Sequence, residues 1–192
     1  MRERSGIHPV FAAAAAVIFV VAVVGGYVWF NTKPPVHAGQ QVSIDAYPIH
    51  RELSTGSALG GLQGQKDVYD EEIVVASVRI KSQTQMPLFL HDMWADVTMA
   101  DGTTQRSTGA STPDYNNVFI AYPALAPKKT SPVLRDTTMT PDQEIDGQII
   151  FHYPISGKDW DARKDFKVTV EFLNQKELVM DETPGNTTGN KQ

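Results

Sequence analysis

His91 and Met93 are the two residues of this chain whose types and spacing come closest to a metal site. The surrounding run Leu88–Met99 is rich in apolar residues and predicts one long strand or two short ones. Residues two apart in a strand project from the same face, so an imidazole and a thioether would lie side by side. These two ligands suit copper in an oxidising compartment. The alternative interpretation is that Met93 fills core space and His91 is an ordinary surface residue.

Other patterns give little sign of catalysis. Asp159, Asp161 and Asp165 share one expected loop with basic residues, which favours a solvated charged loop over a calcium site. The stretch 56–58, Gly-Ser-Ala, lacks the strand–turn–helix context of a nucleophile elbow. We therefore predict that the protein is not an enzyme and holds no cofactor, with copper binding kept as the alternative function.

Several aromatic residues fall in stretches that read as loops or loop edges. We expect these rings to be exposed, and exposed rings often anchor partner contacts. The same rings would serve equally well to close the ends of a β-sandwich. Both interpretations stay open at this stage for four residues: Tyr115, Phe119, Tyr122 and Trp160.

The run Val10–Phe30 predicts a membrane-spanning helix. It has no charged side chain, and at 1.5 Å per residue it would reach about 31 Å, close to the hydrocarbon thickness of a bilayer. Arg2 and Arg4 precede it and only Lys33 follows closely, which places the N-terminus in the cytoplasm. The alternative is a signal peptide cleaved near Ala38, although signal cores are shorter than this run.

Composition excludes some classes of partner and site. The formal net charge is −5, and the chain beyond residue 30 has no excess of basic residues, which argues against a nucleic-acid surface. There is no cysteine, so disulfides and thiolate metal sites are excluded.

The remaining chain reads as one β-rich domain. Short runs with alternating or β-branched residues recur between turn signals, and the clearest is Phe166–Phe172. We expect about seven to nine strands, no helix beyond the first, and an antiparallel sandwich or barrel. The predicted order is a cytoplasmic stub at 1–9, the transmembrane helix at 10–30, a linker at 31–39, the β-sandwich at 40–181 and a disordered tail at 182–192.

A set of structural positions in this domain resembles the immunoglobulin-like (telokin-like) domains of exported and membrane-anchored bacterial proteins of unknown function. These positions are Val74–Lys81, Pro87-Leu88, Trp94 through Asp101-Gly102, and Pro141, Glu144, Gly147, Phe151 and Tyr153-Pro154. Asp142 or Gln143 stands where those domains usually have a glycine. The resemblance implies an all-β immunoglobulin-like sandwich with a surface role, and it supplies no catalytic residues.

Together these observations predict a single-pass protein of the inner (cytoplasmic) membrane. Its C-terminal domain would lie in the periplasm or outside the cell, where it would bind another envelope protein or stabilise an envelope assembly. The sequence leaves the identity of the partner and the oligomeric state open.

Overall fold

A computed structural model describes residues 9–31, 36–54 and 66–182, and it divides the chain into two units, Met1–Pro35 and Val36–Gln192. The first unit contains helix α1 (Pro9–Asn31), where the sequence predicts a helix at 10–30. Among the residues that the structure describes, no helix is long and apolar enough to cross a membrane. Membrane attachment therefore stays a prediction.

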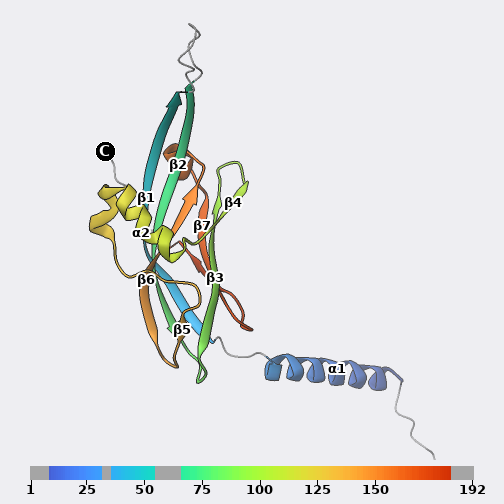
Figure 1. The fold of residues 1–192 in the computed structure, drawn as a ribbon. Helices are drawn as coiled ribbons and strands as arrows, with labels where there is room; N and C mark the ends of the chain where they lie inside the picture. The colour runs from blue at the N-terminus through green and yellow to red at the C-terminus, as the bar shows by residue number, and fades with distance from the viewer. Residues whose placement is uncertain (1–8, 32–35, 55–65, 183–192) are drawn as a thin grey trace, which may run out of the picture. The chain divides into compact units, whose positions relative to one another are not determined.

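The second unit is built from two antiparallel sheets (Figure 1). The first sheet has the order β1-β2-β6, with β1 at His37–Ser54, β2 at Lys66–Ser82 and β6 at Glu144–Tyr153. The second has the order β4-β3-β7-β8, and β5 pairs with β3. Its strands are β3 (Leu88–Thr98), β4 (Thr104–Thr108), β5 (Thr138–Met139), β7 (Asp165–Phe172) and β8 (Leu178–Asp181). The prediction of an all-β, sandwich-like domain of about eight strands is confirmed.

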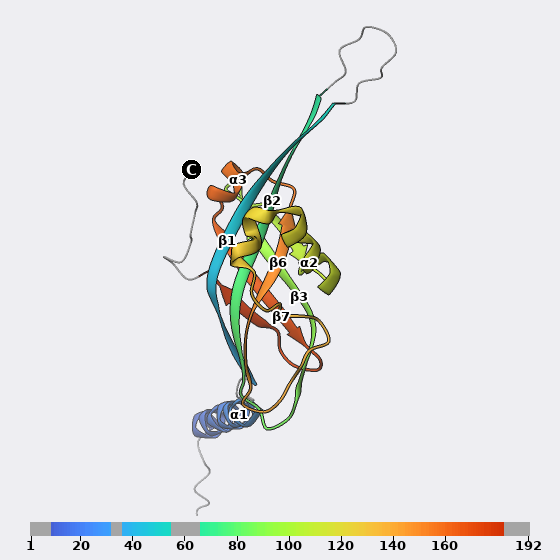
Figure 2. The same ribbon diagram turned by 60° about the vertical axis from the view of Figure 1, so that its left-hand side comes forward.

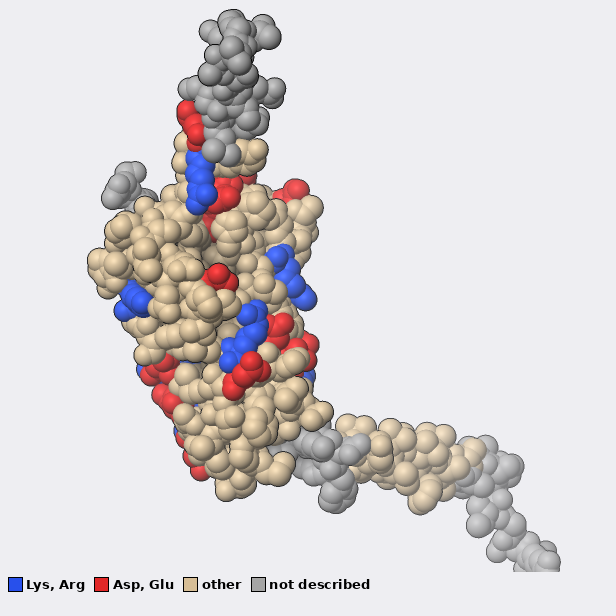
Figure 3. Space-filling view, in the orientation of Figure 1, with Lys and Arg blue, Asp and Glu red and all other residues tan. Residues whose placement is uncertain are grey.

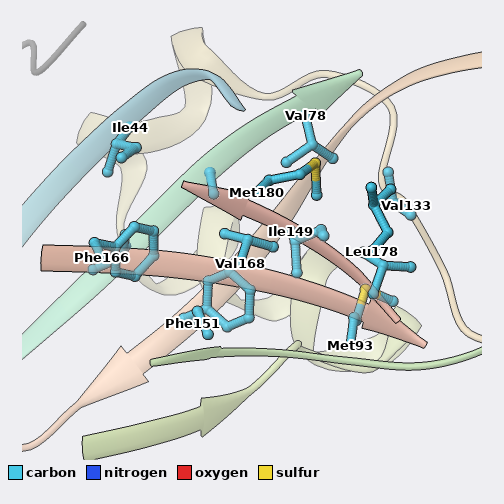
Figure 4. Close-up of a cluster of buried hydrophobic side chains, with 14 of the residues drawn as sticks. Ile44, Val78, Met93, Val133, Ile149, Phe151, Phe166, Val168, Leu178 and Met180 are labelled. Atoms are coloured by element: carbon cyan, nitrogen blue, oxygen red, sulfur yellow. The ribbon is translucent and has the colours of Figure 1, made fainter. Parts of the chain in front are cut away.

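The main core lies between the two sheets, and Figure 4 shows part of it. Strand β2 contributes every second residue, from Val74 to Ile80, and β7 contributes its alternate residues from Phe166 to Phe172. Both sets match the alternation in the sequence, because every second residue of a strand faces the same side of the sheet.

The expectation of no helix beyond the first is wrong. Residues 112–121 form helix α2 (Thr112–Ala121), followed by the 3-10 helix η1 (Pro123–Lys128), where the sequence predicts loop. The sequence contains two features typical of a helix N-terminus. Ser111 caps the helix by accepting from the Asp114 N–H, and Pro113 lies in its first turn. These helices cover the outer face of the first sheet with a second buried cluster, made of Ile49, Ile73, Val75, Tyr115, Phe119, Leu125 and Ile150.

Two further boundaries differ from prediction. The expected loop around residue 160 contains the short helix α3 (Gly157–Asp161). The expected linker at 31–39 overlaps β1, because His37 is already part of the folded domain. The His37 ring stacks on Phe172 with centroids 4.9 Å apart, and its Nε2 lies 2.6 Å from the carbonyl oxygen of Lys176. The tail expected at 182–192 lies almost wholly outside the described residues.

Candidate functional site

The expectation that His91 and Met93 share a face is wrong. A β-bulge lies between Leu90 and Asp92, and it changes the side-chain alternation of β3. Leu90 and Met93 therefore both point into the core although they are three residues apart, and His91 is exposed. The imidazole and the thioether lie on opposite faces and cannot hold one copper ion. The described part of the chain also contains no group of three or more His, Cys, Asp or Glu side chains placed to hold a metal.

Three of the four candidate contact rings are buried, which contradicts the expectation that they are exposed. Tyr115 and Phe119 lie on the buried side of α2, which packs against the first sheet. The Tyr115 hydroxyl donates to the carbonyl oxygen of Thr130 at 2.8 Å. Trp160 belongs to the main core and packs edge-on to Phe166, with centroids 5.3 Å apart. Tyr122 is half-buried. These rings close the ends and the outer face of the sandwich, as the alternative interpretation holds.

The most distinctive surface feature is a projecting hairpin. Strands β1 and β2 pair from His37↔Ser82 to Ser54↔Lys66, whereas β6 pairs with β2 only from Lys81 to Glu72. Beyond Glu72, residues 49–54 and 66–71 form a two-stranded ladder that we call the arm. Figure 1 and Figure 2 both show β1 and β2 running together past the other strands.

The arm exists because β6 ends before its neighbours do. Tyr153 is the last residue of β6, and Pro154 follows it. Proline lacks the N–H that would continue a ladder, so it is a natural end for an inner strand. From that point β2 has a neighbour on one side only.

The alternating direction of the backbone hydrogen bonds in the first sheet shows which N–H and C=O groups lie on the open edge of β2. The N–H and C=O of Gln148 in β6 bond to Ser131 and Val133, away from β2. Gln148 lies opposite Ser77 of β2, so these two residues are not hydrogen-bonded to each other and the backbone groups of Ser77 point towards β1. Because the direction alternates along a strand, the even-numbered residues of β2 direct their backbone groups towards β6. Continued into the arm, this alternation places the N–H and C=O of Val68 and Asp70 on the open edge. Glu52 and His50 of β1 lie opposite these two residues, in the non-hydrogen-bonded positions of the ladder.

A hollow of about 680 Å³ lies between the arm and the residues that follow β6. We call it the α3-side hollow. Three consecutive residues of the arm, Val68 to Asp70, line one side of it, and Pro154 to Ser156 line another. Its acidic lining residues are Asp70, Asp101 and Asp159, and none of the described residues that line it is a Lys or Arg.

A second cleft of about 600 Å³ lies at the base of the arm beside α2. Its floor is apolar, with Ile73 and Ile150, and its rim is charged. Two contacts cross this rim: Arg51 donates to the Tyr122 hydroxyl, and His152 Nε2 lies 3.3 Å from a Glu71 carboxylate oxygen. Figure 3 shows acidic and basic groups interspersed over one face of the domain, without a continuous basic patch among its described residues.

A side-chain hydrogen bond links the two strands of the arm. His50 Nδ1 lies 2.7 Å from Asp70 Oδ1, directly across the ladder. This hydrogen bond is the main reason why the pKa of His50 is raised above its usual value, and the charges of Asp70 and Glu52 add to it. The arm also exposes Val68 at 52% and Tyr69 at 48%.

Glu72, at the base of the arm, is the unusual titratable group of the domain. Its side chain is buried beneath α3, and its Oε2 has no hydrogen-bond partner among the described residues. A Cβ added to Gly157 would lie 3.5 Å from that oxygen. Burial raises the pKa of Glu72 to about 7, the charge of Asp161 raises it further, and that of Arg163 opposes the rise.

Comparison with known proteins leaves the family open. No protein family and no curated protein matches this chain. One solved structure that resembles it is described as the X-ray structure of Northeast Structural Genomics Consortium target SoR45. It is 10% identical, the match covers 78% of this chain and 94% of that chain, and the TM-score is 0.32. The site must therefore be interpreted from its own geometry.

Proposed function

We propose that this protein is a membrane-anchored, extracytoplasmic β-sandwich domain that binds a partner protein of the cell envelope through the arm. The observation that carries the proposal is the length of the arm, six residues of β2 beyond the last pair with β6. Strand edges are normally covered or blunted, because an open edge invites pairing with another chain. An arm held out with an open edge is well suited to contact another protein.

The energetics of the arm support the same role. An isolated two-stranded hairpin is marginally stable in water. Val68 and Tyr69 leave about half of their surface in solvent, so the arm gains little from burial in the free domain. A partner that covers these side chains would supply the missing apolar contact at about 25 cal/mol per Å².

The anchor is proposed from the sequence, from the run Val10–Phe30 and the basic residues before it. The position of β1 favours retention over cleavage near Ala38. Ala38 is within β1 and pairs with Lys81, and cleavage after it would remove His37 from its stack on Phe172. The immunoglobulin-like assignment is part of the same proposal and is supported by the two-sheet arrangement.

Site-specific photo-crosslinking in the native membrane tests the proposal. A photoreactive residue at Tyr69 is expected to give a discrete adduct with another envelope protein. The matched control is Val179 in β8, which is 51% exposed but far from the arm in sequence. The absence of an adduct at Tyr69, or equal adducts at both positions, would refute a binding role for the arm.

An intact-mass measurement on the chain purified from its own membranes tests the anchor separately. The expected mass includes residues 1–38. A mass that begins at Gly39 would instead show that the domain is released as a secreted protein.

A further inference from the structure

We propose that the arm takes up an extended segment of the partner protein as an added strand along the open edge of β2, with a lysine or arginine of that segment in the α3-side hollow. This inference rests on the proposed function and specifies how the partner is recognised.

The first support is the place of the hollow in the sheet. It is lined both by the arm of β2 and by the residues that follow β6, so it occupies the continuation of β6. A strand seated there would restore the three-stranded order of the sheet beyond Glu72. Strand addition of this kind draws affinity from main-chain hydrogen bonds and specificity from pockets for alternate side chains.

The second support is the direction of the backbone groups. Val68 and Asp70 present their N–H and C=O on the open edge of β2, which adjoins the hollow, whereas those of Tyr69 face β1. The outer edge of β6 is in contrast already occupied, because Ala110 donates to Ile150 and the Ser107 hydroxyl accepts from His152. The arm is thus the part of β2 that is able to accept a new strand.

The third support is charge, which selects the side chain of the occupant. Asp70, Asp101 and Asp159 all line the hollow. Each already takes part in one local interaction, with His50, Thr103 and Ser156 respectively. A carboxylate offers about four acceptor positions, so each of the three retains capacity for a donor. Lys164 adds positive charge near Asp101 but is not among the lining residues, and a cationic side chain is the complementary occupant.

Selection of displayed peptides on the full-length chain in nanodiscs provides the probe. The library carries random segments of about ten residues, which is a long strand. The selected segments are expected to alternate β-branched residues with polar ones and to carry Lys or Arg at one fixed position. Failure to enrich any segment, or a consensus without a basic residue, would overturn the proposal.

Backbone and charge variants separate the two parts of the recognition. Val68→Pro removes an N–H that faces the hollow and spares the bonds to β1, so it is expected to weaken a selected peptide at least about tenfold. Val68→Thr retains the N–H and is the matched control. The double change Asp101→Asn and Asp159→Asn retains the hydrogen-bond acceptors and is expected to abolish the preference for Lys over Gln in the peptide. Equal binding by Val68→Pro and Val68→Thr would overturn strand addition.

Hydrogen exchange on the unmodified chain gives a readout that does not depend on a variant folding. A bound peptide is expected to slow exchange at the amides of Val68 and Asp70 and to leave that of Tyr69 nearly unchanged. Uniform slowing, or none, would contradict strand addition. If Tyr69 still crosslinks to a partner in the membrane, the proposed function stands and only the mode of recognition fails.

The other occupant to be tested is a second copy of this chain. Sedimentation of the full-length chain in detergent is expected to show the same species for the parent and for Val68→Pro. A dimer that disappears in Val68→Pro would show that the arm pairs with itself, and it would overturn the assignment to a different protein.

Discussion

Replacing Glu72 with Gln should change the pH dependence of stability in a specific way. The folded state holds the proton of Glu72 up to about pH 7, whereas an ordinary glutamate has a pKa near 4.5. Below the unfolded-state pKa the Glu72 carboxyl group is protonated in both the folded and the unfolded chain, so its ionisation has no effect on stability. Between the two values the unfolded chain releases its proton while the folded chain keeps it, so stability falls as the pH rises. Above the pKa of Glu72 in the folded state, the free energy of unfolding falls no further from this group.

The size of the effect follows from the two pKa values. A difference of one unit is worth about 1.36 kcal/mol, and the shift from 4.5 to about 7 therefore gives a total near 3 kcal/mol. Glutamine has nearly the same shape and does not ionise. The free energy of unfolding of Glu72→Gln relative to the parent should accordingly rise by about 3 kcal/mol from below pH 4.5 to about pH 8.

Denaturant titrations of the full-length chain in detergent, followed by tryptophan fluorescence at several pH values, measure this difference. The matched control is Glu177→Gln, because Glu177 is an exposed glutamate outside the cluster around Glu72. The control and the parent should show the same pH dependence. If the curves of Glu72→Gln and the parent also run parallel, then Glu72 is solvated in the folded state and the description of its burial is wrong.

Three further predictions test individual contacts. Gly147→Ala should lower stability by about 2 kcal/mol in denaturant titration, because the added Cβ would meet a backbone oxygen at 2.9 Å, and unchanged stability would show that the neighbouring segment yields freely. Tyr153→Phe should cost about 1 kcal/mol in the same assay, since the buried hydroxyl donates to the carbonyl oxygen of Ala95 at 2.8 Å, and no loss would mean that this bond contributes nothing net. Asp70→Asn should lower the pKa of His50 in an NMR titration, because it removes the charge and weakens the hydrogen bond that raise it, and an unchanged value would place the cause elsewhere.

The parts of the fold that follow from the sequence are strands whose alternate residues enter the core. In β7, Phe166 and Phe172 bracket an alternation that the structure reproduces without a shift. The Asp101-Gly102 turn was equally readable, and Gly102 has a positive φ of 92°. Gly147 within β6 is typical of a close backbone approach, and an added Cβ would lie 2.8 Å from Val133.

The sequence-based predictions that are wrong concern the alternation of side chains around His91 and the helix α2. The bulge after Leu90 adds a residue to β3, and a change of one residue reverses which side chains face the core. Nothing in the run around His91 signals this insertion. Helix α2 is a different case, since its cap and its proline were visible but the helix is only ten residues long. Its apolar residues cover the outer face of the first sheet, a contact that the sequence alone does not reveal.

The two open edges of the arm are not equivalent, and this difference bears on where a partner strand can bind. Glu72 directs its backbone groups towards β6, so Pro48, which faces it, has its nitrogen on the outer edge of β1. A proline at that point removes a donor from the edge and is a common protection against unwanted pairing. The edge of β2 from Val68 to Asp70 has no proline and adjoins the α3-side hollow. Pairing along β1 is therefore blunted at the base of the arm, and we expect a partner strand to add to β2.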